Sequence, residues 1–129
     1  MNIVMTLEMA AECHPDRIAV SCDGRSLSYA QLLDAARRAA GAIAAGGSAY
    51  VGLLDVNSVA APVALYAAAY AGVPYVPLNF RLTAAEIGAL LARIAPAFLV
   101  ADAALLGAAR VPAGVGVVGR DALLARAGQ

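Results

Sequence analysis

The sequence predicts an α/β fold: a parallel sheet flanked by helices on both faces, a Rossmann/flavodoxin-like subdomain, with a small N-terminal β-hairpin. Three observations support this prediction. Helical and strand patterns alternate from Ser28 onward, as they do in parallel sheets. Tyr50–Leu54 is a nearly continuous apolar run, typical of a strand buried on both faces. Two helices begin with capping signals. A chain of 129 residues is expected to form a single domain, residues 1–129.

The N-terminal part of the chain carries the patterns of one short helix and one hairpin. Residues 5–12 offer an apolar side suited to a helix. His14-Pro15-Asp16 is interpreted as a proline-fixed turn. The segments 18–22 and 25–27 flank Asp23-Gly24. An Asp-Gly pair between two short strands is typical of a tight hairpin turn.

The first long helix is predicted from Ser28 to about Ala45. Ser28 and Gln31 have the spacing of a capping box, in which each side chain accepts a hydrogen bond from the other residue's backbone N–H. Gly46-Gly47 ends the helix. A phosphate-binding loop follows a strand and opens a helix, whereas this glycine pair precedes a strand. We therefore interpret it as a helix stop.

The central stretch predicts a strand, a helix and a second strand. The strand Tyr50–Leu54 leads into a helix from about Val59 to Ala71, with Gly72 just past its end. Pro62 fits this helix only in its first turn, where the missing N–H costs little. Residues 73–78 predict a second, shorter strand bracketed by prolines.

The alternation of helix and strand continues to the end of the chain. Thr83 and Glu86 have the spacing of a second capping box. The helix that they open is expected to end before Pro96. The remaining elements are predicted as a strand over 97–100, a short helix over 103–109, a strand over 115–118 and a last short helix over 120–127.

The helix from Val59 to Ala71 has no polar face. A helix that is apolar all round is covered on more than one side, and one sheet covers only one. The second cover is expected to be the rest of a larger protein, a second copy of the chain, or a membrane. Val56 to Phe80 is long enough for a bilayer, but Gly72 and Pro74 split it into two pieces that are too short. No transmembrane segment is therefore predicted.

Composition also suggests a surface that needs a partner. The chain is 62% hydrophobic and its net charge is zero, whereas an ordinary soluble domain is about 45–50% apolar. Polar surface is therefore scarce for a free-standing monomer. Exposed apolar patches drive association, so we expect the isolated chain to form oligomers.

Charged and metal-binding residues exclude several functions. Arg37-Arg38 is the only basic cluster and no aromatic platform accompanies it, so no nucleic-acid binding is expected. His14 is the only histidine, which leaves neither a metal cluster nor a Ser/His/Asp arrangement. Cys13 and Cys22 are interpreted as free thiols of a reducing compartment. No signal-peptide pattern opens the chain, and a cytoplasmic location is expected.

Polar side chains follow several of the predicted strands. In open parallel sheets, ligands bind outside the carboxyl ends of the strands. The residues expected there are Asp55, Asn57, Ser58, Asn79 and Asp102. These residue types also cap helices and stabilise turns, and we favour that role for each of them. They include no recognisable pair of nucleophile and base, which argues against a small α/β enzyme with its own site.

Four segments follow one another in a recognisable order: residues 14–20 (HPDRIAV), 27–32 (LSYAQL), Asn57-Ser58, and 71–83 (AGVPYVPLNFRLT). Together they resemble the start of the adenylate-forming acyl-CoA synthetases, which are AMP-forming ligases. The resemblance covers about Leu7 to Val118. Residues 77–83 resemble the acyl-CoA ligase branch, because peptide-synthetase adenylation domains more often have Asp where Asn79 stands.

This resemblance implies an enzyme that activates a carboxylic acid with ATP and magnesium to an acyl-adenylate, then transfers the acyl group to coenzyme A. The family's Ser/Thr/Gly-rich nucleotide loop ends in Pro-Lys-Gly, and these residues contain no lysine. No catalytic, cofactor-binding or metal-binding residue is therefore carried over. This region of such enzymes is mainly scaffold and helps to hold the acyl pocket. Asn57, Asn79 and Arg81 are the candidates for substrate contacts.

Two functions remain open. The first is an N-terminal fragment of an ATP-dependent fatty-acid or carboxylate–CoA ligase that is inactive alone. The second is a non-catalytic binding or dimerisation module derived from that fold. ATP, magnesium and CoA are implied only for the full-length enzyme. The expected partner is the remainder of the ligase or a second copy, contacting the helix from Val59 to Ala71.

Overall fold

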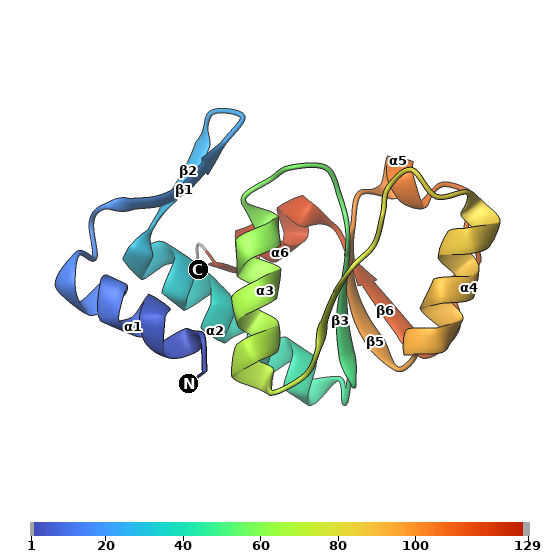
Figure 1. Cartoon of the computed structure of the whole chain (residues 1–129), viewed down its shortest axis with the longest axis horizontal. Helices are drawn as coiled ribbons and strands as arrows, with labels where there is room; N and C mark the ends of the chain where they lie inside the picture. Colours follow the sequence, from blue (N-terminus) through green and yellow to red (C-terminus); the bar gives the residue numbers. More distant parts are fainter. Residues whose placement is uncertain (1, 128–129) are drawn as a thin grey trace.

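The chain folds around a four-stranded parallel sheet with helices on both faces (Figure 1). This architecture comes from a computed structural model that describes residues 2–127. The strand order is β4-β3-β5-β6. The strands are β3 (Tyr50–Leu54), β4 (Tyr75–Pro77), β5 (Ala97–Ala101) and β6 (Val115–Val118). The predicted fold class is confirmed.

A helix and a separate antiparallel hairpin precede the sheet. Helix α1 (Val4–Cys13) leads into β1 (Ile18–Cys22) and β2 (Arg25–Ser28). Asp23 and Gly24 both have positive φ angles, 52° and 76°, as a two-residue turn of type I′ requires. The predicted hairpin is confirmed, and it lies on the side of α2 and α3 away from α4 (Figure 1).

Helix α2 (Tyr29–Ala45) begins with the predicted capping box. The Gln31 backbone N–H donates to Ser28 Oγ at 3.2 Å, and the Ser28 N–H donates to Gln31 Oε1 at 2.8 Å. Its buried stripe of Leu32, Ala35, Ala36, Ala39, Ala40 and Ile43 packs chiefly against helix α3 (Ala60–Ala71) rather than against the sheet.

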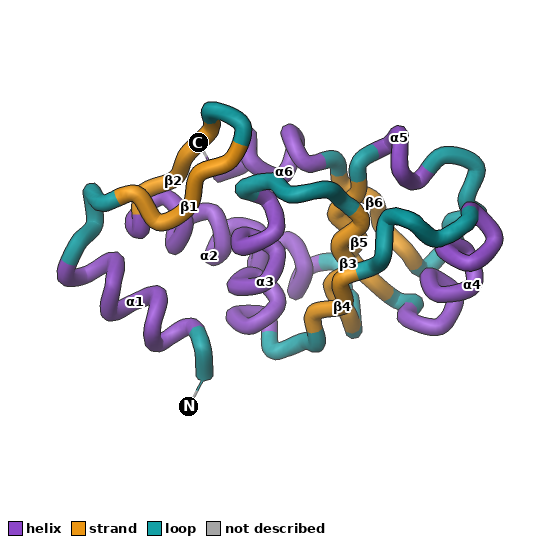
Figure 2. Tube along the Cα trace, turned by 45° about the horizontal axis from the view of Figure 1, so that its top comes forward, coloured by secondary structure: helices purple, strands orange, loops and turns teal. Residues whose placement is uncertain are grey.

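Helix α3 is covered on both sides by its own chain. One side packs on β3 and β4, and the other packs on α2, with α1 and α6 (Arg120–Ala127) beside it (Figure 2). The prediction that the second cover lies outside the chain is wrong for most of this helix. Small alanine side chains let two helices approach closely, and between α2 and the sheet Val63, Ala64, Ala67 and Ala68 are buried. Pro62 lies in the first turn, as predicted.

The opposite face of the sheet is covered by helix α4 (Ala84–Ile94), which also begins with a predicted capping box. Ile87 and Leu91 pack with Leu54 and Leu99. Helix α5 (Ala103–Leu106) is shorter than the predicted 103–109, because Gly107 turns the chain with a φ of 51°. Strand β4 is shorter than the predicted 73–78: Pro74, just before it, has no N–H to donate to the ladder, and Leu78, just after it, still donates to the Leu53 oxygen at 2.8 Å. Within residues 2–127, no helix combines the length and apolar character needed to cross a bilayer.

Candidate functional site at the carboxyl edge of the sheet

The candidate site lies where β3 and β5 end side by side. These neighbouring strands continue in different directions: β3 leads to α3 on one face, and β5 leads to α5 on the side of α4 (Figure 1). Such a switch in direction opens the crevice in which open α/β sheets bind ligands. Asp55 follows β3 and Asp102 follows β5, so both predicted residues lie at this crevice.

Arg120, the first residue of α6, occupies the crevice. Its Nε donates to Asp55 Oδ2 at 2.9 Å, and its Nη2 donates to Asp55 Oδ1 at 2.6 Å. Nη2 also donates to Asp102 Oδ2 at 3.3 Å. The Asp55 side chain is 0% exposed and that of Arg120 is 31% exposed. The two-point pairing of a planar guanidinium with a carboxylate is the strong form of this interaction.

Two further donors complete the hydrogen bonding of Asp55. The Val56 backbone N–H donates to Oδ1 and the Ser58 hydroxyl donates to Oδ2, both at 2.9 Å. A buried carboxylate is tolerated only with such compensation. The hydrogen bond to Asp55 is also the main cause that raises the pKa of Arg120, so its guanidinium stays protonated. With four donors on its two oxygens, Asp55 is suited to hold structure together and not to act as a general base.

The other polar residues at this edge have local roles. Ser58 Oγ accepts from the Ala60 N–H at 3.2 Å, and Asp102 Oδ1 accepts from the Ala104 N–H at 3.0 Å. Asn79 Oδ1 accepts from the Arg81 N–H at 2.9 Å in a turn. The predicted capping and turn roles are therefore confirmed for these three. Asp102 also accepts a hydrogen bond from Arg120. For Asp55 the predicted local role is incomplete, because besides the Val56 N–H it accepts two hydrogen bonds from the distant Arg120.

The three candidates for substrate contact are exposed and lie outside this ion cluster. The Asn57 backbone oxygen accepts from the Cys22 thiol at 3.2 Å, while its side chain belongs to an exposed residue. The Arg81 guanidinium lies 5.7 Å from the centre of the Phe80 ring. A hollow of about 540 Å³ between the hairpin and the loop after β3 is bordered by Cys22, Asp55 and Asn57.

Arg120 was missed by reasoning from the sequence. Nothing local distinguishes an arginine at the start of a short helix. The available signal was positional: Gly119-Arg120 follows β6, and the carboxyl ends of parallel strands meet at one edge of the sheet. An arginine at that edge, opposite two aspartates that follow neighbouring strands, could have been paired with them.

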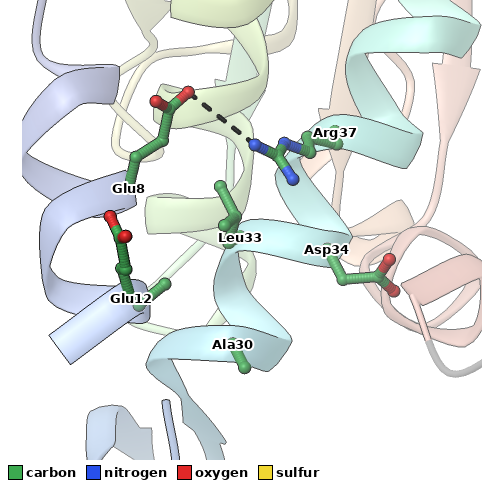
Figure 3. A pocket seen from close by; sticks show the side chains of 7 residues that line it. Glu8, Glu12, Ala30, Leu33, Asp34 and Arg37 are labelled. Carbon is green, nitrogen blue, oxygen red and sulfur yellow. Dashed lines mark ion pairs between the residues drawn. The ribbon is translucent and has the colours of Figure 1, made fainter. Parts of the chain in front are cut away.

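A second polar hollow, of about 380 Å³, lies between α1 and α2, remote from the carboxyl edge (Figure 3). Glu8 and Arg37 face each other across it, with Glu8 Oε1 and Arg37 Nη2 3.8 Å apart. The Tyr70 O–H also donates to Glu8, at 2.5 Å. These contacts join α1 to α2 and α3. Among the described residues, no group of His, Cys, Asp and Glu side chains could hold a metal ion.

The chain matches the AMP-binding enzyme family over residues 7–126. It belongs to this family, and it corresponds to the N-terminal segment of an AMP-forming ligase. The resemblance seen in the sequence is therefore confirmed.

Two characterised relatives are ligases of different acids. The chain is 35% identical over 102 residues to the indoleacetate–CoA ligase of Aromatoleum aromaticum, covering 77% of this chain and 20% of that protein. It is 37% identical over 93 residues to the fatty acid–[acyl-carrier-protein] ligase ScoC of Streptomyces coeruleorubidus, covering 70% and 18%. The aligned part is therefore about a fifth of each relative's length.

Solved structures agree with this assignment. The N-terminal domain of FACL13 from Mycobacterium tuberculosis superposes with a TM-score of 0.79 at 29% identity, covering 100% of this chain and 36% of that one. A benzoate CoA ligase from Burkholderia xenovorans superposes with a TM-score of 0.80 at 27% identity, covering 97% and 28%.

Proposed function

We propose that this chain forms the N-terminal part of an ATP-dependent ligase for a fatty acid or another carboxylic acid. The observation that carries the proposal is the family match over residues 7–126. Both relatives' names describe the joining of an acid to a carrier thiol, coenzyme A or an acyl carrier protein. The full-length enzyme would use ATP, magnesium and CoA. Its place would be in fatty-acid or related acid metabolism, in the cytoplasm.

The residues present here do not fit ATP, and we propose that they are inactive alone. Lysine is absent from the sequence, and the Gly46-Gly47 pair follows α2 and precedes β3, which is the wrong order for a phosphate cradle. Arg120 lies in the crevice at the carboxyl edge, and all four donors to Asp55 come from the chain itself. The segment would therefore act as a scaffold.

Asn57, Asn79 and Arg81 are proposed to contact the substrate or the wall of its pocket. What supports this is their exposure on loops that follow β3 and β4 at the carboxyl edge. Two large apolar side chains lie in the same loops, Val56 at 41% and Phe80 at 42% exposure. We propose that the remainder of the ligase, or a second copy of the chain, covers this surface.

A chimera tests the proposal. The part of this chain that aligns with the indoleacetate–CoA ligase replaces the corresponding 102-residue segment of that full-length enzyme, and acyl-CoA formation is measured. We expect an active chimera, whereas this chain alone should give no ATP–pyrophosphate exchange. Alanine at Asn57, Asn79 or Arg81 in the chimera should raise KM. A folded but inactive chimera, or exchange by the isolated chain, would contradict the proposal.

The alternative of a non-catalytic binding or dimerisation module stays a prediction. Sequencing the gene downstream of codon 129 distinguishes this module from the ligase. An open frame that encodes the Gly-rich nucleotide loop supports the ligase, and a frame that lacks it favours the module.

A further inference from the structure

We propose that Arg120 is a positioning residue: from helix α6 it sets the conformation of the loop after β3, residues 55–59, and thereby the place of Asn57. This inference rests on the proposed function in one respect only, the role of Asn57 as a substrate contact. The structural part can be tested without any ligase activity.

A continuous chain of hydrogen bonds runs from Arg120 through Asp55 into the loop and on to α3. Arg120 holds both oxygens of Asp55. Those same oxygens accept from the Val56 N–H and the Ser58 hydroxyl. Ser58 Oγ in turn accepts from the Ala60 N–H in the first turn of α3. Four of the contacts that shape this loop therefore meet at the one carboxylate that Arg120 orients.

The loop after β3 is also held on its other side, by the hairpin. The Cys22 thiol, at the end of β1, donates to the Asn57 backbone oxygen at 3.2 Å. The hairpin is also tied to α6, because Arg25 Nη1 lies 3.4 Å from Asp121 Oδ1. Arg120 and Asp121 thus link α6 to the loop and to the hairpin, and Asn57 lies between these two tethers.

The charge of Arg120 also matters for the loop, because it neutralises the carboxylate of Asp55. Both ion pairs of Arg120 are with carboxylates, those of Asp55 and Asp102. The Asp55 side chain is fully buried, so without the guanidinium its charge has no cationic partner and keeps only the two hydrogen bonds from Val56 and Ser58. Such a carboxylate turns toward water or becomes protonated. Turning away breaks the hydrogen bonds from Val56 and Ser58, and protonation weakens them.

The test compares Arg120→Lys with Arg38→Lys in the uniformly ¹⁵N-labelled 129-residue chain. Lysine keeps the charge and the stem but cannot pair with both oxygens of Asp55. We expect Arg120→Lys to shift the side-chain amide signals of Asn57 and to speed amide hydrogen exchange at Val56 and Ala60 by about tenfold. Exchange at Leu91 in α4 should not change. Arg38→Lys, in the exposed pair with Asp34 on α2, should leave all these signals in place.

A chemical rescue completes the test. In Arg120→Ala, guanidinium ion at a non-denaturing concentration should return the Asn57 signals toward their original positions, and sodium ion at equal ionic strength should not. If this variant does not fold, Arg120→Lys alone decides. Unchanged Asn57 signals in Arg120→Lys, or faster exchange spread evenly over the chain, would overturn the proposal, because Arg120 would then contribute only to general stability.

Discussion

At the scale of single residues, Asp55 is the most constrained side chain at the carboxyl edge. It is fully buried, with two bonds from Arg120 and one each from Val56 and Ser58. We expect Asp55→Asn to lower the free energy of unfolding by about 3 kcal/mol, because an amide cannot pair with the guanidinium at both positions. Urea denaturation measures this change.

Asp34 offers a matched control for that prediction. It also pairs with an arginine, Arg38, at 2.9 Å, but both side chains are about half exposed. We expect Asp34→Asn to cost only about 0.4 kcal/mol, as is usual for exposed pairs one helical turn apart. Equal losses in the two variants would show that burial of Asp55 does not matter.

Gly72 provides a second comparison at this scale. It ends α3 with a φ of 73°, and a methyl group added at its Cα would meet no other atom within 4 Å. Any decrease in the free energy of unfolding of Gly72→Ala therefore comes from backbone strain alone, and we expect a decrease of about 1 kcal/mol. Gly41, inside α2, is equally uncrowded and has no positive φ. Gly41→Ala should instead stabilise the chain by about 0.5–1 kcal/mol. Thermal unfolding of both variants checks the opposite signs.

At the scale of the element, the capping box of α4 defines where that helix begins. Thr83 Oγ1 accepts from the Glu86 N–H at 3.2 Å, and Glu86 Oε1 accepts from the Thr83 N–H at 3.2 Å. We expect Thr83→Ala to cost about 1 kcal/mol. Thr6 is the control, since its hydroxyl donates to the Ile3 carbonyl oxygen and caps no N–H. Thr6→Ala should be neutral or slightly stabilising. Urea denaturation of the two variants compares them.

The attachment of α1 should depend on pH. Burial, and then the hydrogen bond to Glu8, raise the pKa of Tyr70. The contribution of its neutral form to stability is fully present below about pH 10, the ordinary pKa of tyrosine, and is lost as the pH rises through the higher folded pKa. We expect stability to fall in this alkaline range, and Tyr70→Phe to reduce the fall.

Urea denaturation at about pH 8 and about pH 11 measures this difference for both chains. Burial also raises the pKa of Tyr75 and of the Cys22 thiol, so Tyr70→Phe should retain part of the alkaline loss. An identical alkaline loss with and without the Tyr70 hydroxyl would contradict the assigned role of its contact with Glu8.

The elements were predictable to different degrees, for physical reasons. Both capping boxes and the Asp23-Gly24 turn depend on neighbours within three residues, so the local sequence pattern was enough to predict them. The cover of α3 was not predictable, because an apolar helix does not reveal whether its second neighbour is α2 of the same chain or another protein. Arg120 was missed for the same reason. Its partner Asp55 is 65 residues away, and only the strand order brings them together.

At the scale of the whole molecule, self-association is expected to involve surfaces in addition to helix α3, on which it was predicted. Although α2 covers much of α3, Leu65 of α3 stays exposed. Other exposed apolar side chains are Val56 and Phe80 at the carboxyl edge and Met5 and Met9 on α1. We expect the isolated chain to associate at high concentration, and Val56→Ser/Phe80→Ser to weaken this. Light scattering over a concentration series checks both. A monomer at high concentration would count against the prediction.

The position of Arg120 in the chain has a consequence for protein synthesis. Asp55 leaves the ribosome 65 residues before the guanidinium that neutralises it, and domains fold as units while the chain emerges. A nascent chain that ends anywhere before residue 120 must keep that carboxylate hydrated, with the crevice open to water. Closure of the carboxyl edge is therefore a late event in translation, and released chains truncated just before and just after Arg120 should differ in their resistance to protease.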